Sequence, residues 1–289
     1  MFGFSPLSST PISAVPAVGR YWVGGSGTWD ASTTTNWAYI TGGVAGATAP
    51  TASDDVIFDS NSNSGTSAFT VTVSTGSLCK NFSTGGYGGD LDGAMSLALS
   101  GTTVAIYGSL LFPATNLSLS ITTSGQFNFS STATGNIISF NGVTSATATT
   151  LLFNGIGGGW TLGSAVSFSS ASSLMNFQDG SFSTAGFAIT TGLITITTGS
   201  GSTRSVSLGA STISLSGLTT FADTTTSGTT FNAGTSAITC SSVGAVTFNS
   251  GGGGGGGFNR GGQGGGGGFN RGGQGGGGGG YNRERRDNY

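Results

Sequence analysis

The most constraining feature of this sequence is a period-two alternation in which apolar residues are separated by Ser or Thr. It appears in short runs, such as FTVTV from Phe69 to Val73, that recur every seven to twelve residues in the stretch 61–250. A period of two places alternate side chains on opposite faces of a strand, whereas an amphipathic helix repeats every three to four residues. The abundant Gly and β-branched residues also disfavour helices. We therefore expect an all-β fold.

A recurring turn phrase helps to choose between the possible all-β architectures. It consists of Phe, then Asn or Gln, and then Gly after at most one further residue, and its five copies begin at Phe140, Phe153, Phe177, Phe231 and Phe248. An inward apolar residue followed by one that tolerates positive φ suits the corner of a solenoid, where Asn side chains can hydrogen-bond from turn to turn. We predict a parallel β-solenoid (β-helix) with turns of about 20–25 residues. A β-sandwich would give similar strand spacing and remains the alternative.

Composition divides the chain into four parts. Residues 1–19 contain three prolines and are predicted to form an extended N-terminal arm. Residues 20–60 hold three of the four tryptophans and are predicted to form a cap. Residues 61–250 carry the alternating runs of the solenoid body. Residues 251–289 form a Gly-rich tail, since Gly fills most positions from 251 to 280.

The side chains that most enzymes use are scarce. The chain has no His, and Lys80 and Glu284 are its single Lys and Glu. Acid–base catalysis by His, catalytic triads with His and zinc sites with His are therefore excluded. The sequence also lacks a phosphate-binding loop, a nucleophile elbow and a CxxC motif. We expect a protein that is not an enzyme and that binds no cofactor.

Carboxylates are the remaining catalytic candidates. An enzyme that cuts polysaccharide needs two of them about 5–9.5 Å apart, and the body offers four aspartates, namely Asp90, Asp92, Asp179 and Asp223. Asp90 and Asp92 fall in the Gly-rich stretch 85–93, which is predicted to be a loop. This stretch partly matches a calcium-binding Gly–Asp repeat, but Asp92 stands where the repeat has an apolar residue and the motif occurs once. A solvated turn is the simpler interpretation, and we expect no metal site.

The chain carries little charge. Charged residues make up 6% of the sequence, against about 25% in ordinary soluble domains, and the net charge is −2. A surface with so little charge repulsion suits a protein that is assembled with others.

Cys79 and Cys240 lie far apart in the sequence and are predicted to be buried free thiols. We expect neither a membrane span nor a standard secretory leader, because no apolar run is long enough and residues 1–20 lack the leader pattern.

One segment carries a family resemblance. From Trp22 to Phe58 the chain reads W-V-G-G-S-G-T-W, then N-W, then a Pro and D-D-V-I-F. In this order and spacing it resembles the opening of many bacterial surface and bacteriophage fibre proteins, where the pattern introduces a parallel β-helix. The resemblance covers about forty residues. It implies a capped solenoid in an extracellular or virion appendage that is commonly a homotrimer and contacts other appendage proteins.

The tryptophans of this segment have three possible roles. Trp22, Trp29 and Trp37 could cover the apolar end of the first solenoid turn, since large aromatic rings bury much surface. They could also simply fill a small N-terminal core, which is compatible with a cap. If exposed, they could instead stack on sugar rings of a host-surface polysaccharide. The following Asp54-Asp55 pair is predicted to lead the chain into a strand at Val56.

The tail has three possible roles as well. Its aromatic and basic residues repeat in a Gly background, at Phe258, Arg260, Phe269, Arg271, Tyr281 and Arg283. This pattern resembles the RGG-type tails of RNA-binding proteins, but so few cations should bind nucleic acid weakly, and we do not expect it. A flexible linker is the plainest interpretation. Packed polyglycine, as in the fibre-tip adhesins of some phages, would need chains from several subunits.

These observations favour a structural subunit of an extracellular appendage. The resemblance points most directly to a phage tail fibre or virion decoration protein that takes part in host attachment. A bacterial surface adhesin or a filament or sheath subunit is the alternative in the same class. An RNA-binding protein is the alternative from another class.

Overall fold

The computed structural model describes residues 19–63, 65–85, 91–113, 115–121, 124–197, 199–201, 203–217, 222–223 and 228–241. Within these residues the regular structure consists of 26 strands, and no helix occurs. The predicted all-β class is therefore confirmed. The N-terminal arm before Gly19 and the Gly-rich tail lie outside the described residues.

The strands form four sheets. The ten-stranded sheet runs β25 (Thr229–Asn232), β22 (Arg204–Ser207), β19 (Gly180–Ser183), β16 (Gly159–Leu162), β13 (Asn136–Ser139), β10 (Leu110–Leu111), β7 (Phe82–Thr84), β4 (Asp55–Phe58), β1 (Gly19–Trp22) and β3 (Trp37–Ala38). The seven-stranded sheet runs β24 (Ala222–Asp223), β21 (Leu193–Ile196), β18 (Leu174–Phe177), β15 (Thr149–Phe153), β12 (Gly125–Phe129), β9 (Thr103–Ile106) and β6 (Leu78–Cys79). The four-stranded sheet runs β11 (Leu117–Ile121), β8 (Met95–Leu99), β5 (Phe69–Val73) and β2 (Gly27–Trp29). The five-stranded sheet runs β14 (Thr144–Ser145), β17 (Val166–Phe168), β20 (Ile189–Thr191), β23 (Thr212–Leu215) and β26 (Ala237–Cys240).

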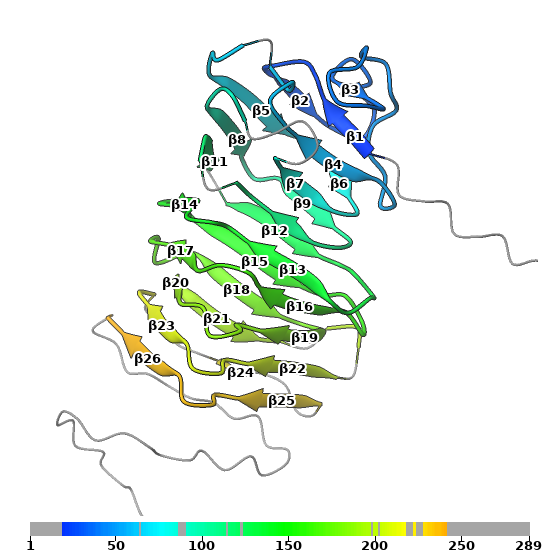
Figure 1. Cartoon of the computed structure of the whole chain (residues 1–289). Helices are drawn as coiled ribbons and strands as arrows, with labels where there is room; N and C mark the ends of the chain where they lie inside the picture. Colours follow the sequence, from blue (N-terminus) through cyan, green and yellow to red (C-terminus); the bar gives the residue numbers. More distant parts are fainter. Residues whose placement is uncertain are drawn as a thin grey trace, which may run out of the picture. The chain divides into compact units, whose positions relative to one another are not determined.

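Consecutive strands visit three sides in turn, which makes the fold a parallel β-solenoid. β4 joins the ten-stranded sheet, β5 the four-stranded sheet and β6 the seven-stranded sheet, and the cycle then repeats for about seven turns (Figure 1). β11 and β14 are neighbours, so the four- and five-stranded sheets together form the third side. Among the described strands, all pairs are parallel except β1 with β3. The predicted solenoid is confirmed, and the alternative of a β-sandwich is wrong.

The turns are longer at the beginning of the solenoid than predicted. On the ten-stranded sheet, Val56 pairs with Phe82, and Phe82 pairs with Leu110, and both turns exceed the predicted length. Further along, Trp160 pairs with Phe182, and this turn is within the predicted range. The early turns differ because their corners hold longer loops. Ten residues separate β7 from β8, whereas three separate β16 from β17.

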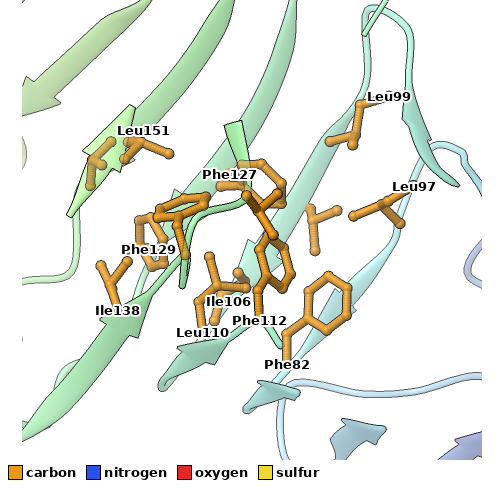
Figure 2. Packing of buried hydrophobic residues seen from close by; sticks show 14 of the residues in the cluster. Phe82, Leu97, Leu99, Ile106, Leu110, Phe112, Phe127, Phe129, Ile138 and Leu151 are labelled. Carbon is orange, nitrogen blue, oxygen red and sulfur yellow. The ribbon is translucent and has the colours of Figure 1, made fainter. Parts of the chain in front are cut away.

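The inward side chains build one continuous core in which aromatic rings meet from turn to turn. Phe82, Phe112, Phe140 and Phe168 come from four successive turns, and their ring centroids are 5.3, 5.5 and 5.2 Å apart in edge-to-face geometry. Figure 2 shows Phe82 and Phe112 among the leucines and isoleucines of neighbouring strands. This geometry is favourable for aromatic pairs beyond the area they bury. The alternating pattern thus supplies one inward residue at every second position.

The corners use the predicted turn chemistry. Asn141 and Gly142 adopt φ values of 45° and 87°. The side chain of Asn141 donates a hydrogen bond to the carbonyl oxygen of Phe112 in the preceding turn (2.7 Å). In another corner the hydroxyl of Ser130 donates to Asn154 Oδ1 of the next turn (2.8 Å). Asn residues therefore link the turns as predicted, but these two pair with a backbone carbonyl and a Ser. The copy of the phrase at Phe248 lies outside the described residues.

The N-terminal end of the solenoid is covered by its own chain. β3 pairs antiparallel with β1, Tyr21 opposite Ala38 and Trp22 opposite Trp37, so β3 lies along the outer edge of β1. β3 is itself the last strand of this sheet, and its two residues offer little backbone for pairing with a strand from another molecule. β4, which lies inside the cap segment 20–60, continues the same sheet into the body. The cap and the body thus share one core.

Candidate functional site

The three N-terminal tryptophans lie inside the protein. Trp22, Trp29 and Trp37 are completely buried. Trp37 makes edge-to-face contacts with both of the others, with centroids 5.0 and 5.7 Å apart, and Trp29 meets Phe82 of the body at 5.3 Å. The cluster therefore fills and covers the first turn, as the cap and core interpretations require. It offers no ring face on which a sugar could stack.

A buried ion pair within the cap joins β1 to the residue that precedes β4. Arg20 Nη1 lies 3.3 Å from Asp54 Oδ1, and both side chains are nearly buried. Arg20 also donates from Nε to the carbonyl oxygen of Thr48 (3.1 Å), and the backbone N–H and hydroxyl of Thr51 donate to Asp54 (2.9 and 2.6 Å). Burying a charge is costly unless it is paired in this way. The predicted role of Asp54-Asp55 is confirmed, because β4 begins at Asp55.

The other carboxylates have structural partners or lie apart. Asp30 accepts hydrogen bonds from the backbone N–H groups of Ser32 and Thr33 (2.7 and 2.6 Å) and from the Thr33 hydroxyl. These bonds lower the pKa of Asp30 from 3.8 to about 2, and the bond from the Ser32 N–H has the largest effect. Asp179 is buried and accepts from the N–H of Gly201 (2.7 Å).

The four aspartates of the body do not form a pair that the structure describes. Asp92 is exposed, next to the buried Leu91. Asp90 lies outside the described residues, as does most of the Gly-rich stretch 85–93, and of Asp223 only the backbone is described, in β24. No group of three or more His, Cys, Asp or Glu that could hold a metal occurs in the part of the chain that is described. That the protein is not an enzyme and that it binds no metal therefore remain predictions.

Both cysteines are free thiols, but only one is buried. Cys79 lies in the core, whereas Cys240 in the last described strand is half-buried, which corrects the prediction of two buried thiols. Loss of hydration raises the pKa of both thiols, and nearby Asp55 adds to the effect at Cys79. Neither thiol is therefore activated as a nucleophile.

The outer faces of the sheets carry ladders of hydroxyl and amide groups. On the ten-stranded sheet, Thr161, Ser183, Ser207 and Asn232 stand in register on four successive strands. On the five-stranded sheet, the corresponding ladder is Ser167, Thr190, Ser214 and Thr239. Strands are about 4.8 Å apart, so each ladder repeats at that interval. Such groups both donate and accept hydrogen bonds without attracting ions. These ladders of uncharged groups are the candidate functional surface.

The alternating pattern indicated that Ser and Thr would face outward, but it did not reveal this register. Another feature that the pattern missed is a group of exposed apolar residues in the cap, Tyr39, Ile40 and Val44. The sequence did contain a signal for this group, because these residues follow Trp37 in a Gly-rich stretch without period-two alternation.

The predicted contact residues of the tail lie outside the described residues and stay predictions, namely Phe258, Arg260, Phe269, Arg271, Tyr281 and Arg283.

Comparison with protein-family models, with curated proteins and with solved structures finds no match for this chain. Among the described residues, no helix has the length and apolar character that crossing a membrane requires.

Proposed function

We propose that this protein is a structural, non-enzymatic subunit of an extracellular appendage, and in particular of a phage tail fibre or another virion fibre that attaches to a host surface. The observation that carries the proposal is the parallel solenoid whose outer faces carry ladders of uncharged hydroxyl and amide groups. Hydroxyl ladders repeat on its sides, while Arg20, Asp54, Asp179 and Arg204 are buried. A stacked solenoid is a rigid spacer whose stability comes from contacts between neighbouring turns.

The surface chemistry supports contact with uncharged partners. A face of Ser, Thr and Asn can hydrogen-bond to the hydroxyls of a neutral host polysaccharide, and it does not repel a second copy of the same chain. Self-association, as a homotrimer or another homo-oligomer, and contact with other appendage proteins belong to the proposal. The opening pattern around Trp22, Trp29 and Trp37 supports the phage or bacterial surface setting by resemblance.

The location of the protein tests this proposal most directly. Antibodies raised against the purified chain would be used for immunogold electron microscopy of the source cells and of any virus particles they release. Label on particle fibres would support the phage fibre. Label on cell-surface filaments would support the alternative, a bacterial adhesin or sheath subunit. Label confined to the cell interior would overturn both.

RNA binding is the second candidate, favoured only by the Arg and aromatic residues of the tail. It predicts that the intact chain retains single-stranded RNA on a filter at about 150 mM salt. It also predicts loss of retention when residues 251–289 are deleted. The appendage proposal predicts no retention by either protein.

A further inference from the structure

The cap displays an apolar patch that the solenoid itself does not use. We define the cap patch as Tyr39, Ile40 and Val44, which are 53%, 67% and 94% exposed and follow one another within a short stretch of the loop after β3. The other exposed large apolar residues of the described chain, Tyr107, Leu111, Ile137, Ile156 and Phe187, are spread over later turns. Scattered apolar residues are ordinary on a surface, whereas a cluster marks a place of contact.

The loop that carries the patch is fastened at several points. The N–H groups of Gly46 and Ala47 both donate to the carbonyl oxygen of Trp37 (2.9 Å each). At the other side of the loop, Thr41 donates to Asp59 Oδ2 (2.6 Å) and accepts from Asn61 (3.0 Å). These hydrogen bonds hold the loop in one conformation. A partner that binds the patch therefore loses little conformational entropy in ordering it.

The N-terminal arm enters the fold beside the patch. Arg20, the second residue of β1, lies with its guanidinium carbon 4.9 Å from the centre of the Tyr39 ring. The same Arg20 is held by Asp54, so its charge is already neutralised. The chain that precedes β1 is thus tethered close to the patch. Because of this tether, its effective concentration at the patch is high.

The chemistry of the arm matches that of the patch. Residues 1–18 contain no charged residue and include six large apolar side chains besides Met1, namely Phe2, Phe4, Leu7, Ile12, Val15 and Val18. Prolines at 6, 11 and 16 lack the N–H that a central strand would donate, so this segment is poorly suited to continuing the sheet beyond β3. Fully extended, a segment of this length spans up to about 60 Å, far more than the contact needs.

From these observations we propose that the N-terminal arm, residues 1–18, folds back onto the cap patch and completes the cover that β3 begins. The arm contacts Ile40 and Val44 through its apolar side chains. Covering them removes an apolar surface from the end of the solenoid, where solenoids otherwise associate end to end. The inference does not depend on the appendage proposal, because it concerns one molecule in solution.

The test combines deletion of the arm with removal of the patch. Four proteins are compared: the full chain, the chain lacking residues 1–18, the full chain with Ile40→Ser and Val44→Ser, and the shortened chain with the same two substitutions. The probe is the dye anilinonaphthalene sulfonate, which fluoresces on exposed apolar surface. We expect deletion to raise its fluorescence severalfold and the two substitutions to abolish that rise.

A second measurement follows the arm in the intact chain. Chymotrypsin cleavage near Phe4 and Leu7, followed by intact mass, should be about tenfold faster in the full chain with Ile40→Ser and Val44→Ser, because cleavage tracks the released fraction of the arm. The full chain with Leu111→Ser and Ile137→Ser, which changes two exposed residues outside the cap, should cleave at the original rate.

Two results would overturn the proposal. The first is that arm deletion does not raise dye fluorescence, or raises it equally with and without the two substitutions, and that the substitutions do not speed cleavage of the arm. The second is an oligomer, seen by sedimentation, that the patch substitutions dissociate but arm deletion leaves intact, since the patch would then bind a second copy.

Discussion

At the scale of single residues, the stability of this protein depends on large rings that meet between turns. Trp29 is the clearest case, because its ring contacts Trp37 in the cap and Phe82 in the body. Removing such a ring leaves a cavity that a parallel stack cannot close without shifting its register. The cap tryptophans are therefore structural residues.

We predict that Trp29→Ala lowers the free energy of unfolding by about 3–5 kcal/mol. Leu111→Ala is the control, because Leu111 is 41% exposed and its truncation should cost much less. Urea denaturation followed by tryptophan fluorescence measures both, since three tryptophans remain in the variant. Equal losses in the two variants would show that the aromatic cluster is not a stabilising centre.

Asp30 makes stability depend on pH. Its pKa is about 2 in the folded protein and 3.8 ordinarily, so the charged carboxylate favours the folded state. This contribution is complete above the ordinary value and is lost as the pH falls through about 2. Because Asp30 is largely solvated, the contribution should be below about 1 kcal/mol.

We predict that Asp30→Asn is less stable than the natural protein at about pH 6 and that most of the difference is lost by about pH 2. Urea unfolding at the two pH values measures it. A difference that persists at the lower pH would mean that the loop, rather than the charge, is responsible.

At the scale of the elements, the corners decide how closely the turns stack. A Cβ added to Gly155 would overlap the carbonyl oxygen of Ser131 in the preceding turn, whereas one added to Gly142 would meet nothing within 4 Å. Gly142 instead has a positive φ of 87°. One corner glycine is thus needed for contact between turns, and the other for backbone conformation.

We predict that Gly155→Ala destabilises the protein by several kcal/mol, because backbone must move to admit the methyl group. Gly142→Ala should cost only about 1 kcal/mol, the strain of its conformation. Thermal unfolding followed by circular dichroism compares the two variants. The reverse order would contradict the stacking at this corner.

At the scale of the whole molecule, each turn touches only its neighbours, so the ends are the vulnerable points. The N-terminal end is covered by β3 and the tryptophan cluster. In the last described turn, Phe231, Ile238 and Cys240 are only partly buried against the core. A repeat protein needs such ends covered to stay soluble.

We predict opposite effects for two truncations. Deleting residues 251–289 should leave the midpoint of thermal unfolding within about 2 °C, because the tail contributes few apolar residues to a core. Deleting residues 1–54 removes β1, β2, β3 and three buried tryptophans, and should lower the midpoint by about 10 °C or more or cause aggregation. A large loss on tail deletion would show that the tail packs on the solenoid.

The sequence alone determined the features that depend on neighbouring residues. Period-two alternation determined the strands and which side chains point inward, as at Phe69, Val71 and Val73. The Asn-Gly pair at 141–142 determined a corner, because positive φ is a local property of those residues. The match around Trp22 indicated where the solenoid starts, although its implication for function remains a proposal.

Only the tertiary structure decided the features that depend on residues far apart along the chain. The pairing of Val56 with Phe82, the ion pair of Arg20 with Asp54 and the ladder through Ser183 and Ser207 each join positions that a full turn or more of chain separates. Local pattern cannot set such separations, because corner loops of different length shift the register without changing the alternation. For the same reason the burial of the three tryptophans and the exposure of Val44 depend on how the turns stack.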